Sequence, residues 1–171
     1  MKEYTVDELL EAREKRVALI EKLLKRYNTP LLLIRVNYPG LKKMNNLTLQ
    51  ITQDMSHLIC TRLGAKVCGK VLLHGAEGPI VCVAVEEDVL ALKTVAVDFE
   101  GKHCLGRCLD LDVYDLEGRC LGRQELGYPS RKCYLCEDDA HHCVRSKRHS
   151  EQEVIAFIEA RYREYLEVKR I

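Results

Sequence analysis

The chain has 171 residues, of which 47% are hydrophobic and 31% charged, and this composition predicts one domain over residues 1–171. Its 27 basic and 26 acidic residues leave a net charge of +1, so no global charge favours nucleic acid or a membrane surface. Because no signal peptide and no apolar run of roughly 20 residues is present, we expect a cytoplasmic protein without a membrane partner. Its nine cysteines are then expected to be reduced thiols rather than disulfides.

The predicted secondary structure begins with a helix, because Thr5 and Glu8 match a capping box ahead of an apolar stripe that continues to about Tyr27. The elements predicted after it are a central strand at 31–36, a helix at 47–63 ended by Gly64, a hairpin of 67–74 with 79–85, a short helix at 87–93, strands at 94–100, 108–115 and 119–123, and a last helix at 151–169. Helices at both ends of a mostly antiparallel sheet indicate an α+β fold rather than a doubly wound sheet.

A pair of acidic residues in the strand at 108–115 suggests a cation site. Because side chains alternate along a strand, Asp110 and Asp112 share one face. Asp98 and Glu100 would join them if the strand at 94–100 paired with this one. Such carboxylates repel one another unless a cation lies between them, and Mg²⁺ held by carboxylates and substrate phosphates would supply it. The alternative is that these acidic residues lie on the solvent-exposed face of a sheet whose other face is buried.

A Cys-rich segment at about 131–149 contains candidate ligands for a metal ion. The set with tetrahedral zinc spacing is Cys133, Cys136, Cys143 and His149. His141 or His142 could replace His149, and the pattern also allows a redox Cys-x-x-Cys pair or buried thiols without metal. A zinc ion with four protein ligands would be structural, because its coordination shell has no open position.

Basic residues surround both motifs and are candidates for binding phosphate. They are Lys42, Arg107, Arg131, Arg145 and Arg148. Guanidinium groups suit multidentate phosphate recognition, although basic runs of this size are often only solvated. Acidic and basic clusters in one small domain favour an enzyme that handles a polyphosphate, and no P-loop motif is present. The competing class is an RNA-binding zinc knuckle, but its ligand spacing is tighter and stacking aromatics are few, so no nucleic acid partner is expected.

Three motifs together resemble a known family. They are Asn-Tyr-Pro-Gly-Leu-Lys-Lys at 37–43, the Gly-Lys-His-Cys-Leu-Gly-Arg-Cys-Leu-Asp-Leu-Asp run at 101–112, and Arg-x-Cys-x2-Cys-x3-Ala-x2-Cys-x-Arg-x3-His at 131–149. Their order is similar to that of the holo-citrate lyase synthases, also called apo-citrate lyase phosphoribosyl-dephospho-CoA transferases. The resemblance extends over nearly the whole chain, and the last motif is its most specific part.

The resemblance implies a reaction and its partners. The phosphoribosyl-dephospho-CoA group of triphosphoribosyl-dephospho-CoA would be transferred to a serine of the citrate lyase acyl carrier protein, the gamma subunit, with release of diphosphate. Related malonate decarboxylase synthases are nucleotidyltransferase-like, which by analogy suggests a similar fold and a metal-binding Asp-x-Asp. The Gly-Ser pair that nucleotidyltransferases carry before the acidic strand is absent here. A nucleotidyltransferase for another carrier protein is the alternative.

The mechanism implied by the resemblance assigns a role to each candidate residue. Asp110 and Asp112, together with Asp98, would hold Mg²⁺ on the donor triphosphate. Arg107 and the arginines of the Cys-rich segment would grip the phosphates, and His103 beside Arg107 would help to cradle them. A carboxylate or His103 would accept the proton of the serine.

Overall fold

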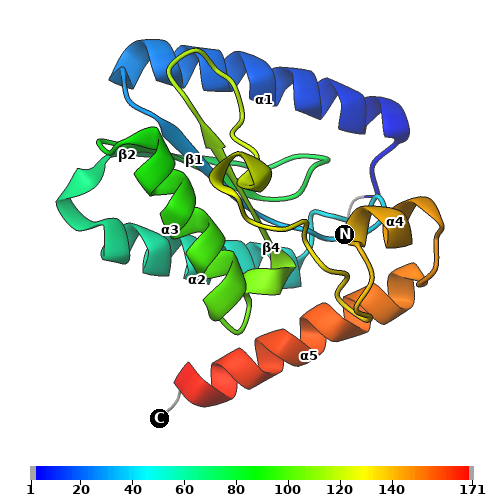
Figure 1. Ribbon diagram of the computed structural model, residues 1–171. Coiled ribbons are helices and arrows are strands. Elements are labelled where there is room, and N and C mark those ends of the chain that lie inside the picture. Colours follow the sequence, from blue (N-terminus) through cyan, green and yellow to red (C-terminus); the bar gives the residue numbers. More distant parts are fainter. Residues whose placement is uncertain (1–2, 170–171) are drawn as a thin grey trace.

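The structure, a computed structural model, describes residues 3–169 and contains one four-stranded sheet (Figure 1). Its strands are β1 (Leu31–Val36), β2 (Val67–Leu73), β3 (Ile80–Val85) and β4 (Leu109–Tyr114). The order across the sheet is β2-β3-β1-β4, and every pairing is antiparallel. This confirms the predicted α+β class, the central position of β1 and the β2–β3 hairpin.

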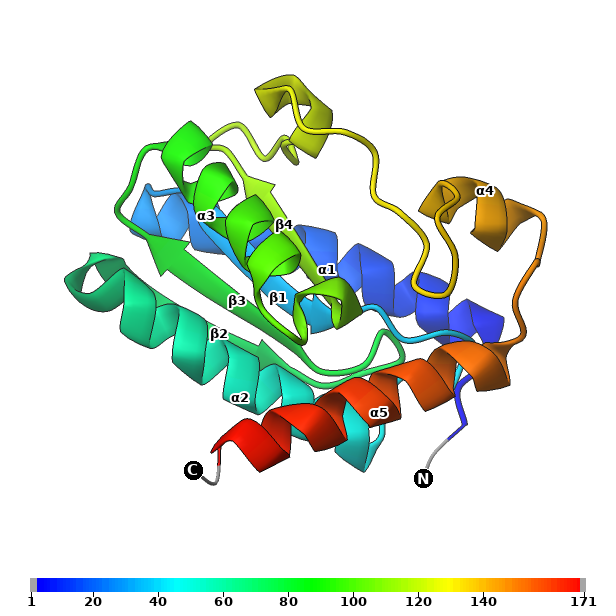
Figure 2. The same ribbon diagram turned by 60° about the horizontal axis from the view of Figure 1, so that its bottom comes forward.

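Helices cover both faces of the sheet (Figure 2). They are α1 (Val6–Tyr27), α2 (Asn46–Leu63), α3 (Val89–Lys102), the short α4 (Ala140–Arg145) and α5 (Glu151–Lys169). The order β1–α2–β2–β3–α3–β4 with this strand arrangement is the split β-α-β topology. Helix α1 precedes that unit, and the Cys-rich segment and α5 follow it. Within residues 3–169, no helix combines the length and apolar character needed to cross a bilayer.

Alternation along β1 divides the apolar side chains between two cores. Leu32, Ile34 and Val36 belong to the larger core, which α2, α3 and α5 complete. Leu31 and Leu33 belong to the smaller core, where α1 packs through Ile20, Leu23 and Leu24. The apolar stripe of α1 therefore covers one part of its face of the sheet, and the remaining part carries polar side chains of β1 and β4.

The sequence prediction for residues 94–100 was wrong, because they lie in helix α3 rather than in a strand. The alternation of Val95, Val97 and Phe99 imitates a strand. The helix is nevertheless favoured by its N-cap, since the Asp88 carboxylate accepts hydrogen bonds from two backbone amides of the first turn. Among the described residues, β4 pairs with β1 alone. Asp98 and Glu100 therefore do not lie on a strand beside it.

The predicted strand at 119–123 was also wrong. The chain forms a single antiparallel bridge between Tyr114 and Cys120 and then a 3-10 turn at Arg123–Leu126. A turn that begins at Asp115 brings the chain back to β4, and Arg119 pairs with Asp115 across it at 3.2 Å. The segment therefore ends the sheet without adding a strand.

The outer edge of β4 is covered by side chains from α3 and the Cys-rich segment. Glu100 is 4% exposed and accepts a hydrogen bond from the Leu111 amide at 2.9 Å. Lys93 donates to the Leu111 carbonyl, and Arg131 donates to the Leu109 carbonyl and to Glu100. These contacts satisfy the backbone groups of an edge strand and fix Arg131 beside the acidic residues of β4.

Candidate active site and metal-ligand cluster

Asp110 and Asp112 lie on the α1 face of β4, where both accept hydrogen bonds from one guanidinium nitrogen of Arg35. The Arg35 Nη2 atom is 2.6 Å from Asp110 Oδ2 and 3.2 Å from Asp112 Oδ2. Arg35 lies opposite Asp110 in the register of β1 with β4, so the sheet itself aligns the three side chains. The two carboxylates thus converge on one cationic position, as the alternation of β4 predicted.

Glu77 adds a third carboxylate from the loop between β2 and β3. Its side chain is 6% exposed, and its oxygens lie 2.8 Å from Arg16 Nε, 3.5 Å from Arg35 Nη1 and 3.9 Å from Arg13 Nε. The loop approaches the chain after β1 closely, because a Cβ on Gly78 would meet the Lys43 carbonyl oxygen at 2.9 Å. Gly78 also has φ +87°, so both the conformation and the contact require glycine there.

Burial and mutual charge shape the electrostatics of this cluster. Burial and the neighbouring Asp110 carboxylate raise the pKa of Asp112, although Arg35 opposes this shift. Burial disfavours the charged form of Arg35, but Asp110 and Asp112 outweigh that effect and raise the pKa of Arg35. Arg35 Nε is buried without a hydrogen-bond partner among residues 3–169. The guanidinium is therefore held mainly by carboxylates.

One hollow adjoins the carboxylates, and a second lies next to it. The smaller has a volume of about 180 Å³ and is lined by Arg13, Arg35, Lys43, Glu77 and Asp110 among others. The larger has a volume of about 610 Å³ and lies between the loop after β1, the Cys-rich segment and the start of α5. Asn37 and Lys43 line both hollows.

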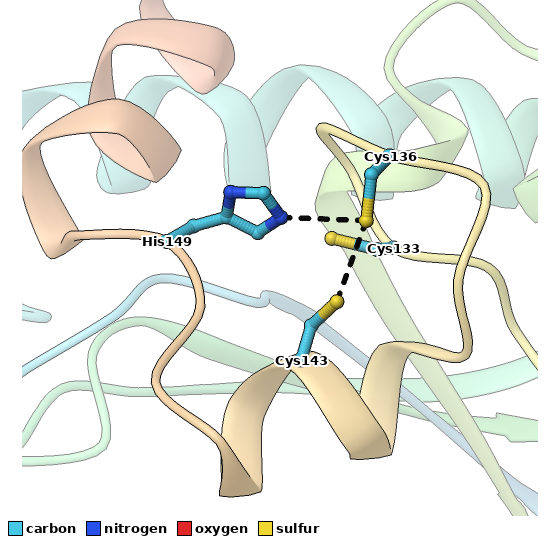
Figure 3. A group of neighbouring side chains, drawn as sticks. All are labelled: Cys133, Cys136, Cys143 and His149. Atoms are coloured by element: carbon cyan, nitrogen blue, oxygen red, sulfur yellow. Dashed lines mark hydrogen bonds between the residues drawn. The ribbon is translucent and has the colours of Figure 1, made fainter.

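The four predicted zinc ligands converge on one point (Figure 3). The Cys133, Cys136 and Cys143 sulfur atoms and one ring nitrogen of His149 all lie within 4.8 Å of one another. Cys136 Sγ is 3.4 Å from both Cys143 Sγ and His149 Nε2. In a tetrahedral zinc site with Zn–S bonds of about 2.3 Å, sulfur atoms are separated by about 3.8 Å, so a small adjustment would accommodate the ion. His149, rather than His141 or His142, is the histidine of this cluster.

Local structure prepares the cluster for a metal ion. The hydrogen bond with His149 is the main factor that lowers the pKa of Cys136, to about 6, and so favours the thiolate that metals bind. Cys143 is buried on α4, whose N-cap is Asp139. Arg107 donates hydrogen bonds to the carbonyl groups of Lys132 and Cys133, which ties the segment to the turn before β4.

The predicted phosphate-binding residues are distributed over several places. Arg131 lines the larger hollow and lies 3.9 Å from Asp110. Arg107, in the turn before β4, donates a hydrogen bond to the Cys133 carbonyl of the Cys-rich segment. Arg148 belongs to that segment and pairs with Asp138 at 2.9 Å. Arg145 is exposed in the last turn of α4, and Lys42 is exposed beside a different hollow and pairs with Glu3. Arg131 is therefore the predicted basic residue that the structure brings to the carboxylates.

Two other candidates lie apart from Asp110 and Asp112. Asp98 forms an ion pair with Lys102 along α3, at 2.8 Å. His103 stacks on Phe99, with 4.7 Å between ring centroids, and lies near Tyr165 of α5, so it belongs to the opposite face of the sheet. Burial lowers the pKa of His103.

Sequence reasoning missed three residues at the carboxylate cluster. Arg35 had a recognisable signal, because it is the one charged residue of the apolar run at 31–36. Arg16 had none, because a charged residue on an amphipathic helix is ordinarily solvated. Glu77 also had none, because only the fold of the β2–β3 hairpin brings its loop to β1.

Comparisons with known proteins agree with the resemblance stated above. A family model described as apo-citrate lyase phosphoribosyl-dephospho-CoA transferase matches residues 4–165. A Vibrio cholerae serotype O1 protein named as a probable apo-citrate lyase phosphoribosyl-dephospho-CoA transferase is 35% identical over 165 residues, which cover 94% of this chain and 93% of the relative. The enzyme of that name from Citrobacter koseri is 34% identical over 159 residues, covering 91% of this chain and 87% of its own. That of Escherichia coli O1:K1 is 31% identical over 159 residues, with the same coverage of both chains.

Proposed function

The chain belongs to the apo-citrate lyase phosphoribosyl-dephospho-CoA transferase family, and from this membership we propose that it attaches this prosthetic group to citrate lyase. The donor is triphosphoribosyl-dephospho-CoA, and the acceptor is a serine of the acyl carrier protein, the gamma subunit of citrate lyase. The main structural support is that Asp110 and Asp112 both contact Arg35. The small hollow beside them is also lined by Arg13 and Lys43. Carboxylates that converge on a cation, next to basic side chains, suit a polyphosphate substrate.

We assign Mg²⁺ to the carboxylate cluster. Asp110 and Asp112 offer the hard oxygen ligands that this ion prefers, and both now contact the same Arg35 nitrogen, which would have to move aside for the ion to bind. Glu77 lines the same small hollow as Asp110, but its oxygens are paired with Arg13, Arg16 and Arg35, so it is not assigned as a ligand. When bound, the ion would neutralise charge on the triphosphate oxygens.

The chemical step replaces a phosphoanhydride bond of the donor by a phosphoester bond to the serine. The serine hydroxyl oxygen attacks the phosphorus next to the ribose, and a new P–O bond forms. The P–O bond to the two outer phosphates breaks, and diphosphate leaves with the bonding electron pair. The serine proton passes to a carboxylate oxygen of the Asp110–Asp112 pair. His103 is not assigned this role, because it packs against Phe99 on the other face of the sheet.

We also propose that Cys133, Cys136, Cys143 and His149 hold a structural zinc ion. Three sulfur ligands and one imidazole match the softness and the coordination number of zinc. Because the four side chains come from separate parts of the Cys-rich segment, the ion would fix that segment as one wall of the larger hollow.

Mass spectrometry of the carrier protein tests the proposed reaction. We expect the apo-carrier, incubated with enzyme, Mg²⁺ and triphosphoribosyl-dephospho-CoA, to gain the mass of one phosphoribosyl-dephospho-CoA group while one diphosphate is released. A carrier in which the acceptor serine is replaced by alanine should gain nothing. An unmodified wild-type carrier under these conditions would overturn the proposed function.

A further inference from the structure

Lys43 is the charged residue that lines both hollows. Lys43 lies partly buried in the loop after β1 and donates a hydrogen bond to the Tyr38 carbonyl. It lines the small hollow together with Arg13 and Arg35, and the large hollow together with Arg131. A ligand that extends from one hollow to the other would therefore pass Lys43.

The small hollow has the chemistry of a polyphosphate subsite. Arg13, Arg35 and Lys43 supply three cationic groups within a volume of about 180 Å³, next to the carboxylates of Glu77 and Asp110. Burial, followed by the charges of Arg35 and Arg13, lowers the pKa of Lys43. Glu77 and Glu151 act in the opposite direction, and an anionic ligand in the hollow would stabilise the charged form of Lys43 further.

The large hollow has the chemistry of a nucleoside subsite. Its volume of about 610 Å³ falls within the roughly 300 to 1,000 Å³ typical of small-molecule sites. Tyr38 and Tyr134 supply aromatic surface, Val144 and Val154 supply aliphatic surface, and Arg131 supplies a cation. Tyr134 is fixed by its hydroxyl, which donates to the Asn37 carbonyl at 3.1 Å.

We infer that the donor binds across both hollows, with its triphosphate in the small one beside Lys43 and its adenosine in the large one. The inference rests on the proposed function, because it takes the donor from it. In that donor, the triphosphate-bearing ribose is attached to dephospho-CoA, whose nucleoside is adenosine, so one molecule carries both chemistries. The carboxylates of β4 then lie at the phosphate end, where the acceptor serine must arrive.

Lys43→Met tests the phosphate end of this arrangement. We expect KM for triphosphoribosyl-dephospho-CoA to rise roughly ten- to a hundred-fold, because a charge-assisted contact is lost. Binding of dephospho-CoA, which lacks the triphosphate, should change less than about twofold, a difference that corresponds to a negligible free energy. The matched control is Lys22→Met, since Lys22 is an exposed lysine of α1 that lines neither hollow.

Val144→Trp tests the nucleoside end. Val144 is 76% exposed on α4, so a larger side chain can be accommodated there without disturbing the core, yet it borders the large hollow. We expect binding of dephospho-CoA, measured by calorimetry, to weaken roughly tenfold or more because the indole occupies the site. Leu116→Trp is the matched control, because Leu116 is 49% exposed and borders neither hollow.

The outcomes separate this inference from the proposed function. If the wild-type enzyme modifies the carrier but Lys43→Met and Val144→Trp retain the wild-type KM for the donor, the two-hollow site is wrong and the function stands. If Val144→Trp impairs modification with an unchanged affinity for dephospho-CoA, the large hollow receives the carrier protein and the inference is again wrong. A wild-type enzyme that never modifies the carrier removes the function itself.

Discussion

Replacing Asp110 by asparagine should reduce transfer to the carrier protein by about three orders of magnitude, because metal-assisted charge stabilisation contributes several kcal/mol. The change removes one negative charge but keeps the size of the side chain. Asp110 is 28% exposed and lies outside the apolar core, so the fold should persist. The rate of mass gain by the carrier, at saturating donor, is the measurement. Asp112→Asn should have a similar effect, because the same Arg35 nitrogen contacts both carboxylates.

Asp98→Asn is the matched control for these two variants. Its carboxylate pairs with Lys102 along α3, an exposed contact of a kind that contributes about 0.5 kcal/mol or less to stability. We expect near-normal transfer from this variant. Equal losses in Asp98→Asn and Asp110→Asn would mean that the effect is general and that the β4 carboxylates have no special role.

Loss of a zinc ligand should have the second largest effect, on the stability of the protein and on its KM for the donor. Cys136→Ser is expected to abolish binding of one zinc per chain, to lower the melting temperature by about 2–4 °C for each kcal/mol of stability lost, and to raise KM for the donor. The rise in KM follows from the position of Arg131 and Tyr134 in the segment that the metal would fix. Metal content, thermal unfolding and donor KM, measured on the same preparation, check the three parts.

Cys68→Ser provides the matched control, because Cys68 is exposed on β2 and is not one of the four clustered ligands. In wild-type protein stripped of metal by a chelator, the pKa of Cys136 near 6 predicts that this thiol is alkylated first at neutral pH. Restored zinc should protect it. A purified protein that contains no metal and still has full activity would rule out the zinc site.

Much of the fold was predictable because buried apolar residues recur in the sequence with the spacing of a helix or a strand. The run at 31–36 is apolar at almost every position, as expected for a central strand covered on both faces, and it became β1. The strand prediction at 94–100 was wrong for a physical reason. Leu92, Ala96 and Phe99 face the core at helical spacing, and Asp88 caps the first turn, but the β-branched residues between them produce the alternation of a strand.

The candidate site was predictable where its residues are close in sequence. Alternation within β4 indicated that Asp110 and Asp112 share a face, and ligand spacing indicated the three cysteines with a histidine, which the structure identifies as His149. Glu77 and Lys43 meet only because Gly78 lets the β2–β3 loop pack against the chain after β1. Contacts between distant segments of this kind leave no local pattern, so neither the small hollow nor the presence of Glu77 in it was foreseen.

Binding of Mn²⁺, followed by electron paramagnetic resonance, measures whether the carboxylates of β4 hold a divalent cation. In the presence of the donor, the wild-type enzyme should bind one Mn²⁺ per chain at the carboxylate cluster, and the Asp110→Asn Asp112→Asn double variant should lose that site. If the wild-type and double-variant proteins give the same Mn²⁺ titration, the carboxylates of β4 hold no metal ion, and Arg35 is the cation that the two aspartates bind.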